Sequence, residues 1–174
     1  MNESTQNTAL LKETVRFRWS FILFPIIMLA VSIVITAIFY SQLPDVLQFS
    51  FTNGNAVRET EKTAIILMLL GSNAFFSVLA LIIVRMMVAA ARFWTGDASL
   101  IDRMMQLVGN IPGLAQLIIA LAVLHIFIYN AYDVMIGSFQ VVVIALLVLG
   151  AVVIGLQLVR LYIESRMKNN SSGD

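Results

Sequence analysis

The chain alternates between four long apolar stretches and shorter polar segments. Each stretch has about 20 residues, the length that a helix needs to cross roughly 30 Å of hydrocarbon. The apolar residues surround each predicted helix instead of forming one stripe, as in helices buried in lipid or in a bundle. The short alternating segments of a membrane β-barrel are absent from the sequence. The pattern predicts an all-α integral membrane protein, a four-transmembrane-helix bundle with spans at about 21–40, 63–84, 111–131 and 138–160.

Composition favours the same class of protein. Of the 174 residues, 60% are hydrophobic and 12% are charged, whereas soluble domains average about 25% charged residues. So short a chain cannot hide this apolar surface in one core, so we expect a single membrane domain over residues 1–174, with the lipid bilayer as its partner. The net charge of +1 gives no indication of a nucleic-acid partner. The absence of cysteine excludes disulfides and thiolate metal sites.

Lysine and arginine are distributed unevenly among the segments that flank the four stretches. The basic side of a multi-pass protein is usually cytoplasmic, so we expect a cell-membrane protein with both termini in the cytoplasm. An outer loop at 41–62 and an inner connection at 85–110 follow from this orientation. The first stretch is expected to be retained, because Phe39 and Tyr40 stand where signal-peptide cleavage needs small residues. The expected inner side carries Lys12, Arg16, Arg18, Arg85, Arg92, Arg103, Arg160, Arg166 and Lys168, and the outer side carries Arg58 and Lys62.

Residues for catalysis are not evident in the sequence. The centres of the four stretches lack the buried acids on which proton-coupled transporters usually rely, and no phosphate-binding loop, HExxH or GxSxG motif occurs. A lone His125 without a second ligand makes a poor metal site. We therefore expect a protein that is not an enzyme and has no catalytic, cofactor-binding or metal-binding residues. Ser72, Asn73, Ser77, Gln116 and Gln157 are expected to hydrogen-bond between helices, with the lining of a pathway as the alternative.

The segment 41–62 carries turn and strand signals between the first two stretches. Pro44 cannot extend a helix and forces Leu43 to be extended. Phe49 and Phe51 alternate with polar residues, as in a short strand, and Asn53-Gly54 is typical of a tight turn. We predict a folded outer cap, with a connector shaped only for re-entry as the alternative.

One face of the third stretch is expected to lie beneath this cap. His125, Tyr129 and Tyr132 are spaced to share a helix face near its outer end. The alternative for His125 is a neutral histidine that hydrogen-bonds within the membrane. The predicted outer interaction surface consists of Leu43, Pro44, Asp45, Phe49, Phe51, Asn53, Gly54, His125, Tyr129 and Tyr132.

The same loop resembles the signature of SdpI-like bacterial membrane proteins, the domain of unknown function 1648. The resemblance covers about residues 21–81. Gln48 and Ser50 stand where the signature has Pro and His, and Glu59-Thr60 where it has Trp-Gly. The matching residues are Leu43, Pro44, Asp45, Leu47, Phe51, Gly54 and Lys62.

This resemblance implies a non-enzymatic, polytopic membrane protein that protects against, or senses, an envelope-active peptide. That peptide, or another membrane subunit, would be its protein partner. The residues themselves leave two alternative functions open. One is a small structural or assembly subunit of a larger membrane complex, and the other is a small-solute transporter, which the missing intramembrane acids disfavour.

Overall fold

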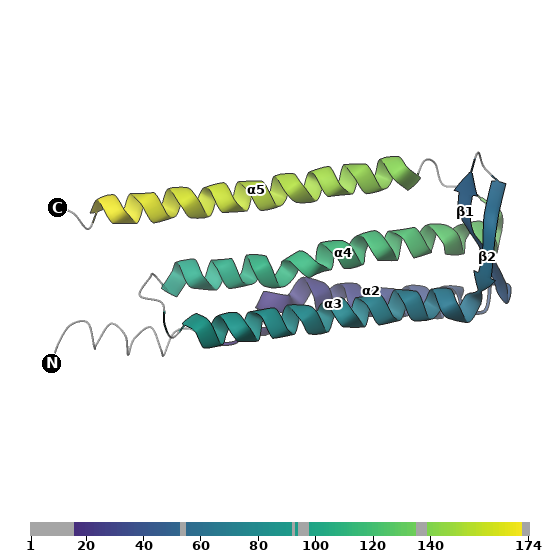
Figure 1. Ribbon diagram of the computed structural model, residues 1–174, viewed down its shortest axis with the longest axis horizontal. Helices are drawn as coiled ribbons and strands as arrows, with labels where there is room; N and C mark the ends of the chain where they lie inside the picture. Colours follow the sequence, from purple (N-terminus) through teal and green to yellow (C-terminus); the bar gives the residue numbers. More distant parts are fainter. Residues whose placement is uncertain (1–15, 53–54, 92, 94–97, 135–138, 172–174) are drawn as a thin grey trace.

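Four long helices and one β-hairpin make up the computed structural model of the protein (Figure 1), which describes residues 16–52, 55–91, 93, 98–134 and 139–171. The helices run up and down along one axis, and the hairpin crosses one end of them. We call this end the hairpin end and the opposite one the far end. In chain order the elements are η1 (Trp19–Ile22), α2 (Leu23–Phe39), β1 (Val46–Thr52), β2 (Asn55–Glu61), α3 (Lys62–Ala91), α4 (Ala98–Tyr132) and α5 (Phe139–Ser171).

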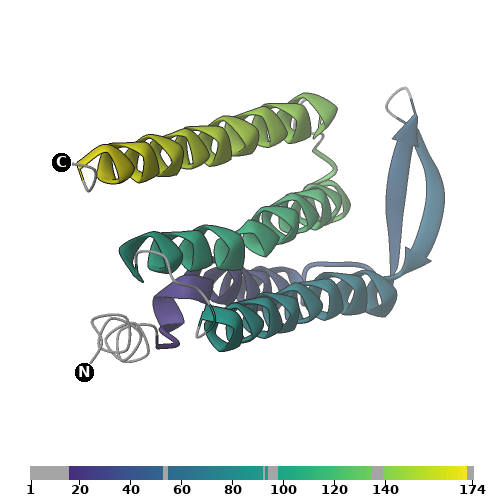
Figure 2. The same ribbon diagram turned by 60° about the vertical axis from the view of Figure 1, so that its left-hand side comes forward.

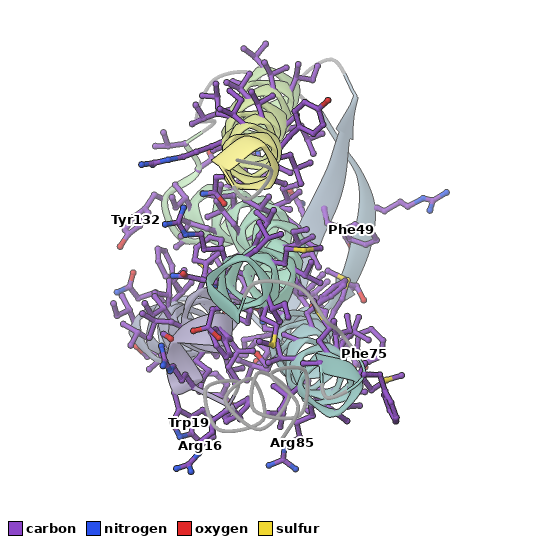
Figure 3. All side chains as sticks on the ribbon, turned by 90° about the vertical axis from the view of Figure 1, so that its left-hand side faces the viewer. Arg16, Trp19, Phe49, Phe75, Arg85 and Tyr132 are labelled. Atoms are coloured by element: carbon purple, nitrogen blue, oxygen red, sulfur yellow. The ribbon has the colours of Figure 1, made fainter. Side chains whose placement is uncertain are left out.

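Three of these helical segments are long and apolar enough to cross a membrane, namely Trp19–Phe39, Lys62–Ala91 and Leu100–Tyr132. Within α5 the apolar stretch is shorter, Ile144–Arg160. Large apolar side chains cover the outside of the helices: Phe75 is 62% exposed and points away from the bundle in Figure 3. The helical, membrane-compatible character predicted from the sequence is thus confirmed for three spans.

The helices α3 and α4 continue beyond the predicted spans, into the segment 85–110 that the sequence suggests is an inner connection. The helix α3 ends only at Ala91, because residues 85–91 are Arg, Met, Val and Ala, most of which favour helix. The helix α4 begins at Ala98 and passes through Pro112. At 1.5 Å per residue, 30 residues span about 45 Å, so α3 is longer than a bilayer's hydrocarbon core.

The core lies among α2, α3 and α4, and α5 contacts α4. One cluster of buried residues lies toward the hairpin end and includes Leu69, Val123 and Phe127. A second cluster joins η1 to α3 and α4 through residues such as Ile22, Val84 and Met105. Figure 2 shows α5 alongside α4, on the side away from α2 and α3.

Two glycines of α4 allow the backbone at Phe21 and the ring of Phe24 to approach this helix closely. A Cβ atom on Gly109 would meet the backbone oxygen of Phe21, and one on Gly113 would meet the ring of Phe24. Beside them, the Asn110 side-chain oxygen accepts a hydrogen bond from the Phe24 N–H at 2.9 Å, at the start of α2, where helical N–H groups lack partners. These contacts seat the first helix on α4.

A layer of polar side chains crosses the middle of the bundle. The Gln116 side-chain nitrogen on α4 donates to the Asn73 carbonyl at 2.6 Å and to the Ser77 hydroxyl at 2.9 Å, both on α3. The Ser77 hydroxyl lies 3.3 Å from the Pro25 carbonyl on α2. Gln116 and Asn73 are fully buried. Hydrogen bonding between helices is thus confirmed for Gln116 and Ser77. The Asn73 side chain and the Ser72 hydroxyl donate to carbonyls of their own helix, and Gln157 is exposed on α5.

Candidate interaction site at the hairpin end

The segment between the first two helices folds into an antiparallel β-hairpin. Phe49 lies opposite Arg58, and Thr52 lies opposite Asn55. The strand predicted around Phe49 is confirmed, and it pairs with a second strand, β2, that is not among the predicted elements. The predicted residues Asn53 and Gly54, and the side chain of Phe51, lie outside the described part of the structure.

A lysine closes the base of the hairpin. The Lys62 ammonium lies 3.2 Å from the Asp45 carboxylate, donates to the Leu43 carbonyl at 3.2 Å, and sits 4.9 Å from the centre of the Tyr40 ring. The backbone N–H of Lys62 also donates to the Asp45 carbonyl at 2.8 Å. The Lys62 side chain is only 15% exposed, whereas that of Asp45 is 97% exposed. Because one partner is in solvent, the ion pair contributes at most about 1 kcal/mol.

Two leucines fasten this base to the bundle. Leu43 is 5% exposed and Leu47 is fully buried, and both belong to the core cluster that contains Leu69 and Phe127. Full burial of a leucine side chain stabilises by about 1.5–3 kcal/mol. These two residues therefore anchor the hairpin more strongly than the Lys62–Asp45 pair does. Pro44, which lies between Leu43 and Asp45, is exposed.

Asn130 of α4 holds the first strand through a matched pair of hydrogen bonds. Its side-chain oxygen accepts from the Gln48 N–H at 2.8 Å, and its side-chain nitrogen donates to the Gln48 carbonyl at 2.9 Å. The amide thus binds both backbone groups of one residue, as the peptide of a neighbouring strand does. The same nitrogen also donates to the Ile126 carbonyl at 2.8 Å, which fixes the side chain against its own helix.

Asn130 is not among the site residues predicted from the sequence. The available signal is an asparagine at the last turn of an apolar helix, facing a loop whose strand needs backbone partners. That signal becomes specific only when the register of the strand is known, because the Gln48 side chain takes no part in these two hydrogen bonds.

Tyr132, on the predicted aromatic face of α4, contacts the end of α2. The Tyr132 hydroxyl donates to the Gln42 side-chain oxygen at 2.6 Å, and its ring meets Phe39 edge-on at a centroid distance of 6.3 Å. Figure 3 shows Tyr132 and Phe49 on opposite sides of the bundle. His125 and Tyr129 are half-buried on α4. Tyr132 therefore supports the end of α2 and lies apart from Phe49.

The site offers strand edges and charged side chains for recognition. Arg58 and Glu59 on β2 are exposed, as is Asp45 at the base. In the described part of the chain the sheet has two strands, so no further strand lies beside the outer edge of β2, whereas Asn130 occupies the outer edge of β1 at Gln48. Within the same residues, no three His, Asp or Glu side chains gather at one point, so no ligand set for a metal can be drawn from them.

Comparison of the chain with models of known protein families, with curated proteins and with solved structures finds no match. The resemblance of the loop to SdpI-like proteins therefore stays a prediction that rests on the matched residues.

Proposed function

We propose that the protein is a four-span protein of the cell membrane, with both termini in the cytoplasm and the hairpin outside. The alternating directions of α2, α3, α4 and α5 in Figure 1 support this topology. The apolar stretch Ile144–Arg160 of α5 lies alongside α4, so it would cross the bilayer with the other three. The described basic residues Arg18, Arg85 and Arg103 lie near the ends of helices at the far end, as a cytoplasmic side requires.

Its function, we infer, is non-enzymatic recognition of an envelope-active peptide at the hairpin, as an SdpI-like protein that protects against or senses that peptide. The observation that carries this proposal is a two-stranded sheet fixed at its base by Leu47 and Asn130, in which, among the described residues, no further strand pairs with the outer edge of β2. An extended peptide can add to such an edge through backbone hydrogen bonds. Arg58 and Glu59 would then contribute charge selectivity, because both are exposed on β2.

The resistance of cells that express the protein to membrane-permeabilising peptides tests this function. Cells with and without the gene are challenged with a panel of membrane-permeabilising peptides, and leakage of a small dye is measured. We expect protection against at least one peptide, and we expect Asn130→Ala to weaken it while the amount of inserted protein stays normal. Arg85→Gln, at an exposed position of α3 toward the far end, serves as the control and should leave protection intact. Equal dye leakage with and without the gene across the panel would refute the proposal.

A second function, as a structural or assembly subunit of a membrane complex, is favoured by α5. Its side chains Ile144, Val148 and Leu156 are all more than half exposed, and in the described structure this helix packs mainly on α4. Apolar helices with one neighbour in a chain often have a second neighbour in another chain. Purification in a mild detergent distinguishes the two functions, because a subunit would elute with stoichiometric partners.

A further inference from the structure

A pocket of about 540 Å³ opens between α4 and α5 toward the far end of the bundle. Its volume falls in the range of typical ligand pockets, about 300–1,000 Å³. The helix α4 contributes most of the lining, α5 contributes one side, and Phe24 lies at the start of α2. The lining residues are Phe24, Arg103, Gln106, Leu107, Asn110, Ile111, Leu114, Ile154, Gln157 and Arg160.

The polarity of the pocket changes along both helices in the same direction. On α4 the lining begins with Arg103 and Gln106 and ends with Leu114, which lies closer to the middle of the bundle. On α5, which runs the opposite way, Arg160 and Gln157 lie toward the far end and Ile154 lies deeper. Two antiparallel helices thus place arginines at one level and aliphatic side chains at another.

The charge of the pocket has one sign. Two guanidinium groups and three carboxamides line it, and none of its lining residues carries a carboxylate. Arg160 also closes the apolar stretch Ile144–Arg160 of α5, so the arginines lie at the boundary between apolar and polar surface. Basic pockets between helices at the cytoplasmic boundary of a membrane suit anionic lipid headgroups.

We propose that this pocket binds the phosphate headgroup of an anionic membrane lipid, with Arg103 and Arg160 on the phosphate and an acyl chain along Leu114 and Ile154. A free phosphate ion would use the arginines but leave the aliphatic part unfilled. A zwitterionic lipid would fill the aliphatic part but bring a positive group toward the arginines. Only an anionic lipid satisfies both parts of the pocket. The inference rests on the proposed placement of the far end at the cytoplasmic interface.

Native mass spectrometry of the detergent-purified protein tests the site with two lipids of identical acyl chains, phosphatidylglycerol and phosphatidylethanolamine. We expect preferential retention of phosphatidylglycerol. Each arginine near a membrane surface contributes about 1 kcal/mol, which corresponds to about fivefold in affinity. The Arg160→Gln variant should therefore bind phosphatidylglycerol about fivefold more weakly, and the double variant with Arg103→Gln about 25-fold more weakly. Arg85→Gln removes an equal charge from α3, outside the pocket, and should change little.

A second variant separates a lipid site from a site for free anions. Ile154→Trp fills the aliphatic part and keeps both arginines, so it should weaken phosphatidylglycerol binding even if the double arginine variant does not fold. Inorganic phosphate at millimolar concentration should not displace the lipid. The proposal is overturned if phosphate competes fully, if both lipids bind equally, or if the arginine variants bind as the wild type does. None of these results bears on peptide protection in cells, so failure of this site is distinguishable from failure of the proposed function.

Discussion

Asn130→Ala removes the polar contact that we expect to hold the hairpin to the bundle. The two hydrogen bonds between Asn130 and the Gln48 backbone are 2.8 and 2.9 Å long and link segments 82 positions apart. A hydrogen bond contributes about 1 kcal/mol net, so the loss of both should weaken docking of β1 by about 2 kcal/mol. That free energy corresponds to about a 30-fold increase in the population of the undocked hairpin.

Hydrogen exchange measured by mass spectrometry reports this population directly, because local opening controls the exchange of protected amides. The Gln48 amide loses its own partner, so the decisive signal is the exchange of the rest of β1. We expect that exchange to accelerate about 30-fold in Asn130→Ala and to stay unchanged in the middle of α3. Tyr132→Phe, which removes only the bond to the exposed Gln42, is the matched control on the same helix. If β1 exchanges at the wild-type rate in a folded Asn130→Ala protein, burial of Leu47 alone docks the hairpin, and our reasoning is refuted.

Three further changes test the remaining contacts. Gln116→Leu leaves the Asn73 carbonyl without its bond to α4 and should lower stability in detergent by about 1 kcal/mol, whereas Ser72→Ala, which removes bonds only within α3, should not; equal melting temperatures for both variants would contradict this. Gly113→Val should drive Phe24 from its seat on α4 and lower the yield of folded protein on size-exclusion chromatography, and a wild-type elution profile would count against the close approach. Lys62→Met keeps the apolar stem but loses the ammonium, so we expect a loss of about 1 kcal/mol in thermal unfolding; a loss above 3 kcal/mol would mean that Lys62 is worth more than its exposed ion pair allows.

The helical part of the fold is largely predictable from the sequence, because a run of 20 apolar residues has few other stable states in lipid. The lengths of the helices are not predictable in the same way. The second predicted span ends at residue 84, where charge begins, but α3 continues to Ala91. Hydropathy reports where lipid ends, whereas the helix ends where the backbone loses its hydrogen bonds. The length of an apolar stretch alone therefore does not predict how far helix-favouring residues extend the helix beyond that stretch.

The sequence predicts only the first strand and the turn of the hairpin. The alternation around Phe49 and the Asn53-Gly54 signal predict a strand and a turn, but β2 contains Arg58, Glu59 and Glu61 and gives no apolar alternation. It is a strand because β1 pairs with it, which is a tertiary effect. The predicted contact with the aromatic face of α4 depends on the direction of the hairpin. Burial of Leu47 and the hydrogen bonds from Asn130 to the Gln48 backbone set that direction. Spacing along α4 contains no information about it.

Labelling of single cysteines in intact cells tests the central claim, which is the four-span topology with the hairpin outside. The natural chain has no cysteine, so each introduced thiol reports on one site. We predict that Glu59→Cys on β2 and Val134→Cys after α4 react with a membrane-impermeant thiol reagent added to whole cells. Ser165→Cys near the end of α5 should react only after the membrane is permeabilised. Labelling of Ser165→Cys in intact cells, or protection of Glu59→Cys in them, would contradict the account.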